Sequence, residues 1–356
     1  MTTSKRSSPM SGHDDVPEVM APRGRTGMTP EAASESFTPD QSVLACVDTS
    51  RDATRLLAHA DAMARAFQIP LTLLRVIGPA SETNGPPDPV DWAIRRHEAR
   101  STLERLAAST WLTTVPNLAL LEGVPGDEIC RAARLQKAAL VVMGVHCLCG
   151  HTSLSANVRK VLERGEGRVL LVPLPESSNE APKYQRILVP LDGSCWSESA
   201  LPTAQRLAHA TGAELVLVHI TTPPDLTSAL PFEPEDIDLR QRFVKRDQSI
   251  ARDYLQRMGD ELVDQGLKVR TLALLGVDAR SGLDEVMRDD AFNLVVLSAW
   301  GHGRTHISDL PYGNVVAYLA GHSPVPVLVT WPSQLQQITS DGGPGSSRTV
   351  GSAFEW

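Results

Sequence analysis

The sequence predicts an α/β protein made of two tandem copies of one domain. Each copy is expected to form a doubly wound, mostly parallel five-stranded sheet with helices on both faces. Three observations lead to this prediction. The chain has 356 residues, which is more than one hydrophobic core usually fills. Its two halves repeat the same order of apolar runs and turns. Within each half, short apolar runs alternate with amphipathic stretches, as in parallel sheets connected by helices.

The repeat is clearest where each copy begins. The first copy opens with residues 42–50, SVLACVDTS, and the second with residues 186–194, RILVPLDGS. Each is a short apolar run that ends in Asp-x-Ser, with Asp48 in one copy and Asp192 in the other. Such a run is typical of a strand buried on both faces, followed by a turn and the N-cap of a helix.

The later strands recur in the same order. Second to fifth strands are predicted in pairs at residues 71–76 and 215–220, 118–121 and 271–275, 139–143 and 294–297, and 169–172 and 327–330. The fifth strands come late in each copy and would otherwise leave an exposed sheet edge. Pairing of the two fifth strands would cover these edges.

Helices are predicted between these strands. Apolar residues at helical spacing predict one helix over residues 56–67 and its counterpart over residues 200–208. A long amphipathic helix is expected before each third strand. In the second copy its apolar stripe is predicted to include Phe243, Ile250, Tyr254 and Met258.

The composition along the chain predicts five parts. These are a disordered tail at residues 1–40, a first domain at 41–173, a linker at 174–183, a second domain at 184–332 and a disordered tail at 333–356. Both tails are polar and lack apolar periodicity. The linker has a polar centre between Pro175 and Pro182.

The overall composition narrows the class of protein. A net charge of −8 and a pI near 5.7 disfavour a general nucleic-acid binder, although a single site for a small nucleotide needs only local donors. We expect no membrane span and no secretory signal, because no apolar segment approaches the required length. The five cysteines suggest no disulfide framework, which favours a cytoplasmic location.

The loops after the first and fourth strands are the expected place for a ligand, because doubly wound sheets bind ligands beyond the carboxyl ends of their strands. In the second copy, residues 297–304 read LSAWGHGR, and residues 311–315, PYGNV, open the last helix. Small residues let the backbone approach a phosphate, and the N–H groups at a helix start attract an anion. Asn314 is also a favoured N-cap residue and could serve the helix alone.

These two segments together resemble the universal stress protein family. The family pairs a V-P-x-D-G-S strand end, here residues 189–194, with a G-x2-G-x9-G-[ST] loop. Ser298, Gly301 and Gly313 stand at the three Gly positions, Asn314 replaces the Ser or Thr, and the loop is two residues longer. The resemblance covers nearly everything outside the tails and implies a fold like that of the adenine nucleotide alpha hydrolases. Because the family pairs its fifth strands, the resemblance also implies that the two copies form an internal pseudo-dimer through these strands.

The resemblance implies that the second copy binds ATP or AMP, with or without Mg²⁺. Asp192 would contact the adenine or ribose end, while backbone at Pro190 and around His219-Ile220 would help to hold the base. His302 and Arg304 are further phosphate partners by charge. The candidate binding residues are Pro190, Leu191, Asp192, Ile220, Ser298, Gly301, Gly303, Gly313, Asn314 and Val315. The implied role is that of a cytoplasmic stress-response or regulatory protein that senses adenine nucleotide.

The first copy is predicted to have a degenerate site. It keeps Asp48 and Gly144, but Cys147, Asn157 and Val158 stand at the positions of the second Gly, the third Gly and the Ser or Thr. Their side chains would project where phosphate oxygens must lie, and we expect the capping hydroxyl to be missing.

Two rival functions remain open. The chain could be an interaction scaffold that binds no nucleotide, or a metal- or redox-responsive protein acting through the loop His146-Cys147-Leu148-Cys149-Gly150-His151. Zinc favours Cys and His, but this loop lacks the usual ligand spacing and a second cluster, so we predict no metal site. Homo-oligomers and an unidentified protein partner also stay open.

Sequence patterns of catalysis are lacking. The chain has no G-x-S-x-G, H-E-x-x-H or Walker A pattern, and no evident general base beside a nucleophile. We therefore expect at most slow ATP hydrolysis. An enzyme acting on an adenylated substrate is a more distant alternative that rests on fold analogy alone.

Overall fold

The computed structural model describes residues 38, 41–48, 53–78, 89–109, 112–145, 154–165, 167–174, 182–223, 234–302 and 311–332. Outside these residues lie the predicted N-terminal tail except Thr38, the predicted C-terminal tail, most of the predicted linker, the Cys/His loop at residues 146–151, Gly303 and Arg304. The first repeat contains β1 (Ser42–Cys46), α1 (Ala53–Phe67), β2 (Leu71–Ile77), α2 (Pro89–Ala107), β3 (Asn117–Glu122), α3 (Pro125–Leu135), β4 (Ala138–Val145), α4 (Ala156–Arg164) and β5 (Arg168–Pro173).

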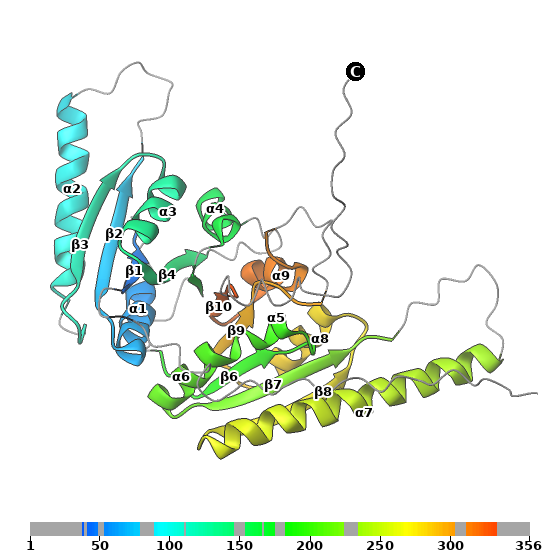
Figure 1. The fold of residues 1–356 in the computed structure, drawn as a ribbon. Helices are drawn as coiled ribbons and strands as arrows, with labels where there is room; N and C mark the ends of the chain where they lie inside the picture. Colours follow the sequence, from blue (N-terminus) through cyan, green and yellow to red (C-terminus); the bar gives the residue numbers. More distant parts are fainter. Residues whose placement is uncertain are drawn as a thin grey trace, which may run out of the picture. The chain divides into compact units, whose positions relative to one another are not determined.

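The second repeat follows the same order with one short helix added. It contains β6 (Arg186–Pro190), α5 (Cys195–Glu198), α6 (Leu201–Thr211), β7 (Glu214–Thr221), α7 (Pro234–Asp264), β8 (Lys268–Leu275), α8 (Ala279–Asp289), β9 (Leu294–Ser298), α9 (Asn314–His322) and β10 (Val327–Thr330). The predicted α/β class with a mostly parallel sheet is confirmed (Figure 1).

The strands form one ten-stranded sheet in the order β3-β2-β1-β4-β5-β10-β9-β6-β7-β8. Neighbouring strands are parallel within each repeat. In the first repeat the strand order reverses at β1, which lies between β2 and β4. In the second repeat it reverses at β6, which lies between β7 and β9. Loops that leave two neighbouring strands in opposite directions open a crevice at such a switch point, so the topology itself selects the ends of β6 and β9.

The two repeats are joined by antiparallel pairing of β5 with β10, which confirms that the fifth strands pair. Leu170 lies opposite Leu328, and Val169 lies opposite Val329. All four residues are fully buried. The pairing satisfies backbone groups that would otherwise form an open apolar edge, and it makes the two sheets continuous.

The sheet is buried on both faces, which explains the unbroken apolar runs. In β6, Ile187 and Val189 pack on the face covered by α1, α2, α6 and α7, while Leu188 packs on the face covered by α3, α4, α8 and α9. Successive side chains of a strand point to opposite faces, so every position in such a strand must be apolar. Each of the two cores contains residues from both repeats.

The long helix α7 departs from the predicted apolar stripe. Leu255 is fully buried and Tyr254 and Met258 are half-buried, but Phe243 is 48% exposed and Ile250 is 55% exposed, so the prediction is wrong for these two. Ile250 lies on the outer side of the helix, because its neighbour Ala251 is only 3% exposed. For Phe243 the physical reason is length. A helix of 31 residues spans about 46 Å, whereas the 8-residue β8 spans about 27 Å. The N-terminal half of α7 therefore runs past the ends of the strands (Figure 1).

A second contact between the repeats lies next to the paired strands. His59 of α1 and Tyr184, just before β6, form a buried hydrogen bond of 2.7 Å between Nδ1 and the hydroxyl. Burial, helped by the charge of Arg55, lowers the pKa of His59 to about 3, so the imidazole is neutral at physiological pH. Arg206 of α6 also donates a hydrogen bond of 2.9 Å to the carbonyl oxygen of Phe67 at the end of α1.

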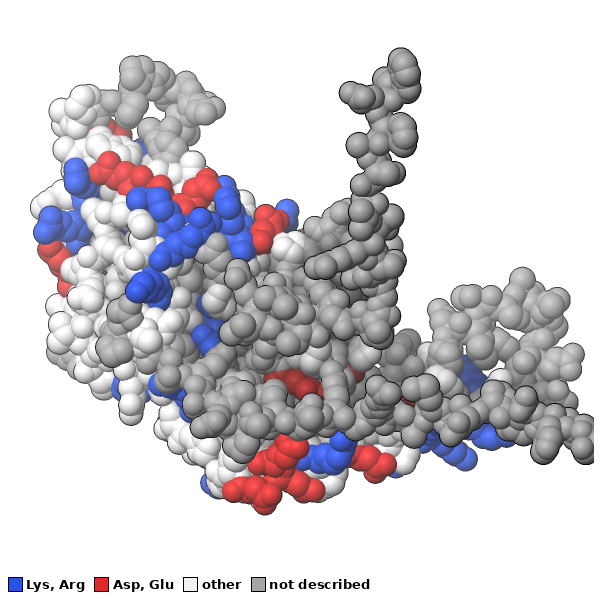
Figure 2. Space-filling model, in the orientation of Figure 1, with Lys and Arg blue, Asp and Glu red and all other residues white. Residues whose placement is uncertain are grey.

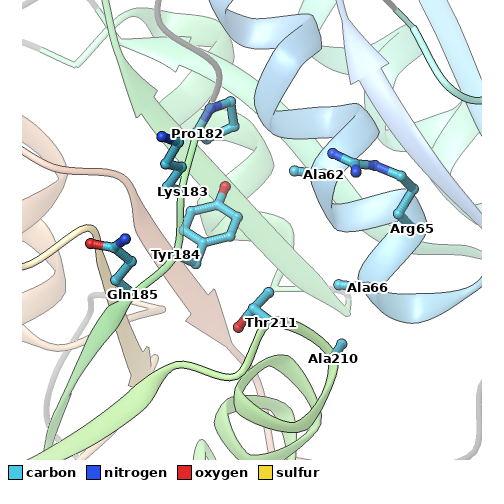
Figure 3. Close-up of a pocket in the computed structure, with 9 residues that line it drawn as sticks. All are labelled: Ala62, Arg65, Ala66, Pro182, Lys183, Tyr184, Gln185, Ala210 and Thr211. Carbon is cyan, nitrogen blue, oxygen red and sulfur yellow. The ribbon is translucent and has the colours of Figure 1, made fainter.

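A surface groove of about 400 Å³ lies beside this contact (Figure 3). Its lining residues are Ala62, Arg65, Ala66, Pro182, Lys183, Tyr184, Gln185, Ala210 and Thr211. They belong to the C-terminal ends of α1 and α6 and to the segment just before β6. The groove therefore lies at the edge of the sheet where β6 begins, away from the carboxyl ends of the strands.

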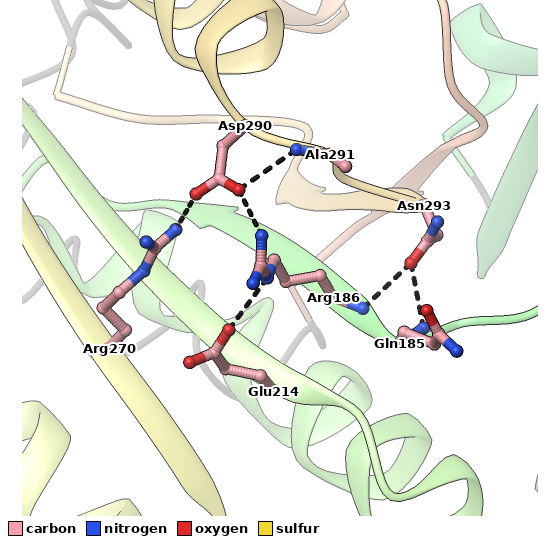
Figure 4. A network of polar contacts seen from close by, with 7 residues as sticks. All are labelled: Gln185, Arg186, Glu214, Arg270, Asp290, Ala291 and Asn293. Carbon is pink, nitrogen blue, oxygen red and sulfur yellow. Dashed lines mark hydrogen bonds and ion pairs between the residues drawn. The ribbon is translucent and has the colours of Figure 1, made fainter.

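An ion-pair network fixes the same edge of the second repeat (Figure 4). Asp290, which follows α8, accepts hydrogen bonds from Arg186 of β6 and Arg270 of β8. Arg186 Nε also bonds Glu214 of β7 at 2.9 Å, and Asn293 Oδ1 accepts two backbone N–H groups at the start of β6 at 3.0 Å. The network aligns the starts of four strands and leaves the opposite edge for loops.

Charged residues of both signs are interleaved on the first repeat. Figure 2 shows Lys and Arg side chains gathered over α3 and α4, with acidic side chains among them. Arg131 pairs with Glu128, and Lys160 pairs with Asp127 at 2.6 Å. Such pairing reduces the positive charge that this surface could offer to the phosphates of a nucleic acid.

We expect Leu328→Ala to lower the free energy of unfolding by about 2–5 kcal/mol, because it leaves a cavity opposite Leu170 in a core shared by both repeats. Urea unfolding followed by circular dichroism should show one transition that shifts as a whole. Leu275→Ala, the same change at a leucine that is 49% exposed on β8, is the control and should have a small effect. Two separate transitions, with only one of them shifted, would contradict a shared core.

We expect Asp290→Asn to lower the free energy of unfolding at pH 7 by roughly 1 kcal/mol, since its ion pairs are partly exposed. The hydrogen bond and charge of Arg270, with the charge of Arg186, hold the pKa of Asp290 below its usual value against the opposing effect of burial. A depressed folded-state pKa stabilises above the unfolded value of about 3.9, and this contribution is lost as pH falls through the folded pKa. The difference between variant and wild type should therefore shrink below about pH 4 in urea unfolding, and Asp289→Asn, an exposed neighbour, should show no such trend.

Candidate functional site

The structure brings together several predicted residues at the carboxyl ends of β6 and β9. These two strands are neighbours, with Ile187 paired to Leu294 and Leu188 paired to Val295. Asp192 follows β6 by two residues, and Gly301 follows β9 by three. The arrangement places a carboxylate beside a Gly-containing loop at the switch point of the second repeat.

The Asp192 side chain is held by hydrogen bonds from two different segments. Its Oδ1 accepts the Ser194 N–H at 3.0 Å and the Ser194 hydroxyl at 2.6 Å. Its Oδ2 accepts the backbone N–H of His302 at 2.6 Å. Burial alone would raise the pKa of Asp192, but these hydrogen bonds, together with one from Ser197, lower it below its usual value. The carboxylate is therefore charged at neutral pH.

Gly301 is required by the close approach of this carboxylate. A Cβ atom at Gly301 would lie 2.3 Å from Asp192 Oδ2, closer than atoms can pack. In the first repeat the corresponding residue is Cys147, which lies outside the described residues.

The two ends of the loop after β9 are tied to each other. The Gly313 N–H donates to the Ala299 carbonyl at 2.7 Å, and Trp300 Nε1 donates to the Pro311 carbonyl at 2.9 Å. The Ala299 N–H is bound in turn to Thr330 of β10 at 2.7 Å. These hydrogen bonds hold the backbone before Gly301 in a fixed position relative to the backbone at Gly313.

Ser298, which stands at a Gly position of the family pattern, faces into the protein. It is 6% exposed, and its hydroxyl accepts hydrogen bonds from the Ser199 hydroxyl at 3.2 Å and the Trp300 N–H at 3.3 Å. Its side chain therefore shapes the turn that leaves β9.

Helix α9 begins one residue earlier than an Asn314 cap would require. Gly313 is the N-cap, with φ −75° and ψ 163°, and Asn314 is the first helical residue. Asn314 therefore does not cap the helix, and no side chain of the described residues does so. The first N–H groups of α9, including that of Val315, lie at the positive end of the helix dipole without a capping side chain.

The residues predicted at the base end offer backbone rather than side chains. Leu191 is 4% exposed and its N–H donates to Val218 at 2.8 Å. The Ile220 side chain lies against α8, where a Cβ on Gly282 would be 2.7 Å from it. Pro190 is the half-buried last residue of β6. This agrees with a role for backbone atoms at Pro190 and Ile220.

The side chains of His219 and Tyr254 lie close enough to Asp192 to feel its charge, and the sequence analysis proposed neither side chain as part of the site. Tyr254 of α7 donates to Glu198 of α5 at 3.1 Å, and its ring stands edge-on to His219 at 6.3 Å. His219 Nδ1 is buried and has no hydrogen-bond partner within the described part of the chain. Burial lowers the pKa of His219, opposed in part by the charge of Asp192. The one available signal was the histidine that interrupts the apolar run of β7.

The corresponding position in the first repeat is filled. Gly144 matches Ser298, and a Cβ there would lie 2.4 Å from the side chain of Leu174. Leu174, the first residue of the predicted linker, is 7% exposed and donates to the Val145 carbonyl at 2.9 Å. These contacts close the end of β4 and favour a degenerate first site.

The expectation that α4 lacks a capping hydroxyl is wrong. Ser155 is its N-cap, and the Ser155 hydroxyl accepts the Val158 N–H at 3.3 Å. The N-cap of α4 therefore lies two residues before Asn157, the position aligned with Gly313, and Val158 packs in the core at 2% exposure. Here the Ser155 hydroxyl occupies one of the N–H groups that an anion would need.

The described residues contain neither a cluster of metal ligands nor a helix that could span a membrane. No group of three or more His, Cys, Asp or Glu residues there could hold a metal ion. Cys46 and Cys195 are free cysteines, and burial, with a contribution from Cys130, raises the pKa of Cys46 to about 12. Across the same residues, no helix is long and apolar enough to cross a membrane.

Comparison with known proteins gives consistent matches. The sequence profile of the universal stress protein family matches residues 41–173 and 183–330. A universal stress protein of Methanocaldococcus jannaschii is 21% identical over 159 residues, covering 41% of this chain and 94% of that protein. One from Thermus aquaticus is 33% identical over 136 residues, covering 37% and 98%.

A solved structure matches across both repeats. The crystal structure of a universal stress protein from Archaeoglobus fulgidus covers 83% of this chain and 100% of its own, with a TM-score of 0.61 and 18% identity. At this identity the likeness shows the fold alone.

We expect the first repeat to bind neither nucleotide nor zinc with useful affinity. Metal analysis of the full chain, purified under reducing conditions, should find no stoichiometric zinc, because the Cys/His loop lacks the ligand spacing of zinc sites. Stoichiometric zinc that is lost in Cys147→Ser and Cys149→Ser would instead support the metal-responsive alternative. Cys195→Ser, at an exposed cysteine in the second repeat, is the control.

Proposed function

The chain belongs to the universal stress protein family, and we propose that its second repeat binds one adenine nucleotide, ATP or AMP, beyond the carboxyl ends of β6 and β9. The observation that carries this proposal is the convergence of the charged Asp192, the close-packed Gly301 and the uncapped start of α9 at one switch point. A small acidic protein with such a site fits a stress-response or regulatory role in the cytoplasm.

The phosphates would bind at the start of α9. Gly313 presents no side chain there, and the N–H groups of Asn314 and Val315 point out of the first turn of the helix. Backbone N–H groups and the helix dipole together favour a phosphate at this position. Gly303 and Arg304 would belong to the same loop but lie outside the described residues.

The adenosine would lie toward β6 and β7. Backbone at Pro190 and Ile220 would hold the base, as the family resemblance implies, and Asp192 would face the adenine or ribose end with a side chain that is 40% exposed. His219 and Tyr254 would close this end of the site from the side of α7.

Any Mg²⁺ would be held mainly by the phosphates of the ligand. Mg²⁺ needs six oxygen ligands in octahedral geometry, and the described residues contain no cluster of carboxylates or histidines that could supply three of them. When bound, Mg²⁺ would neutralise phosphate charge, whereas Asp192 is already engaged by Ser194 and His302.

The direct test is titration calorimetry of the full chain with ATP and with AMP. The full chain is needed because an isolated second repeat would expose the edge of β10 that β5 covers. We expect one site per chain and micromolar affinity. No heat at millimolar nucleotide from a folded protein would end the proposal and would favour the interaction scaffold.

We expect Gly313→Val to abolish nucleotide binding with little loss of stability. The backbone of Gly313 has φ −75°, which valine adopts readily, and a Cβ there would make an ordinary contact of 3.5 Å with the Ala299 carbonyl. The branched side chain would occupy the approach to the first N–H groups of α9. Calorimetry with ATP measures the loss and thermal unfolding checks the fold.

Asn314→Ser is the matched control for this variant. It restores the residue of the family pattern, and Asn314 does not cap the helix, so binding should be kept or improved. Wild-type affinity in Gly313→Val would show that the phosphates do not lie at the start of α9.

A further inference from the structure

We infer that Asp192 is a positioning residue for the phosphate half of the site, because its carboxylate fastens the loop that follows β9. The family resemblance gives Asp192 a direct contact with adenine or ribose. The hydrogen bonds of the ligand-free chain assign it a second task, which is to hold the backbone that receives the phosphates. The effect on binding rests on the proposed function, whereas the fastening itself does not need a ligand.

Asp192 is itself held in place by its own segment. Two donors of Ser194 hold Oδ1, and the Asp192 N–H donates to the Ser197 hydroxyl at 3.2 Å. The Ser194 hydroxyl also caps the short helix α5 by accepting the Ser197 N–H at 3.2 Å. These contacts set the carboxylate in one orientation before it meets the loop.

The loop after β9 is bound by the second carboxylate oxygen of Asp192. Asp192 Oδ2 accepts the His302 N–H at 2.6 Å across 110 residues of sequence, and it packs directly on Gly301. A hydrogen bond to a charged acceptor is shorter and stronger than one between neutral groups. Because the donor belongs to the backbone, the contact fixes the path of the chain rather than one side chain.

The position of this turn is transmitted to the start of α9. Trp300, next to Gly301, is bound to Pro311, and Ala299 is bound to Gly313. A shift at Gly301 or His302 would therefore move the residues that lead into the helix. Release of the carboxylate would change the geometry of phosphate binding without removing any phosphate contact.

Hydrogen exchange on the ligand-free full chain tests the fastening. In Asp192→Asn, the amide has one oxygen for two N–H donors, those of Ser194 and His302, so one donor is left opposite an NH₂ group in either orientation. We expect exchange of the His302 amide and its neighbours to speed up by about tenfold or more. Gly301→Ala should act in the same way, because its Cβ would displace Oδ2.

Asp48→Asn, the same change at the corresponding position of the first repeat, is the control and should leave exchange at His302 unchanged. Thermal unfolding checks that the variants remain folded. Unchanged exchange at His302 in both Asp192→Asn and Gly301→Ala would overturn the inference.

Calorimetry with two ligand fragments tests the effect on binding. With inorganic tripolyphosphate, which has no base, Asp192→Asn should weaken binding by about the same factor as with ATP. With adenosine, which has no phosphate, the loss should be smaller. A loss confined to adenosine would show that Asp192 contacts only the base or ribose. If the wild type binds none of these ligands, the proposed function fails, and the exchange experiment still decides whether Asp192 fastens the loop.

Discussion

The antiparallel pairing of β5 with β10 is the constraint on which the rest of this structure depends. A parallel five-stranded sheet that ends in an apolar strand cannot leave that edge open, because unpaired backbone groups and apolar side chains would face water. Pairing Leu170 with Leu328 removes both edges at once and continues the two cores across the junction. The second repeat therefore needs the first as a cover for β10, whatever the first repeat binds.

The two repeats share one fold but differ at the ends of β4 and β9. The residues that form the core are therefore not the residues that form the candidate site. The buried strands are apolar in both repeats, and the sheet order is the same in each. What differs is the contacts at the ends of β4 and β9. Gly144 of β4 lies against the Leu174 side chain, whereas Ser298, the corresponding residue of β9, binds Ser199 and Trp300 through its hydroxyl. Beyond β9, the Asp192 carboxylate holds the backbone at His302.

The sequence predicted the strands and their order along the chain because burial on both faces leaves an unmistakable apolar run, and the family resemblance predicted the pairing of the fifth strands. The prediction failed where the outcome depends on the relative lengths of packed elements or on contacts between distant segments. Periodicity cannot tell that β8 ends before Phe243 is reached. A helix start is uncertain by one or two residues, which moved the caps to Gly313 and Ser155. The contact of Tyr254 with Glu198 joins distant segments, so spacing carries no signal of it.

A negative charge beside a site for phosphates needs a physical explanation. An uncompensated carboxylate at Asp192 would repel the ligand, but donors from Ser194 and His302 face both of its oxygens and lower its pKa. Repulsion between the carboxylate and a phosphate weakens with distance and with such compensation. The N–H groups of α9 add positive potential on the side where the phosphates would lie. Hydrogen-bond donors of the protein thus compensate the charge of the Asp192 carboxylate. Asp192 can therefore hold the loop while the start of α9 stays attractive to an anion.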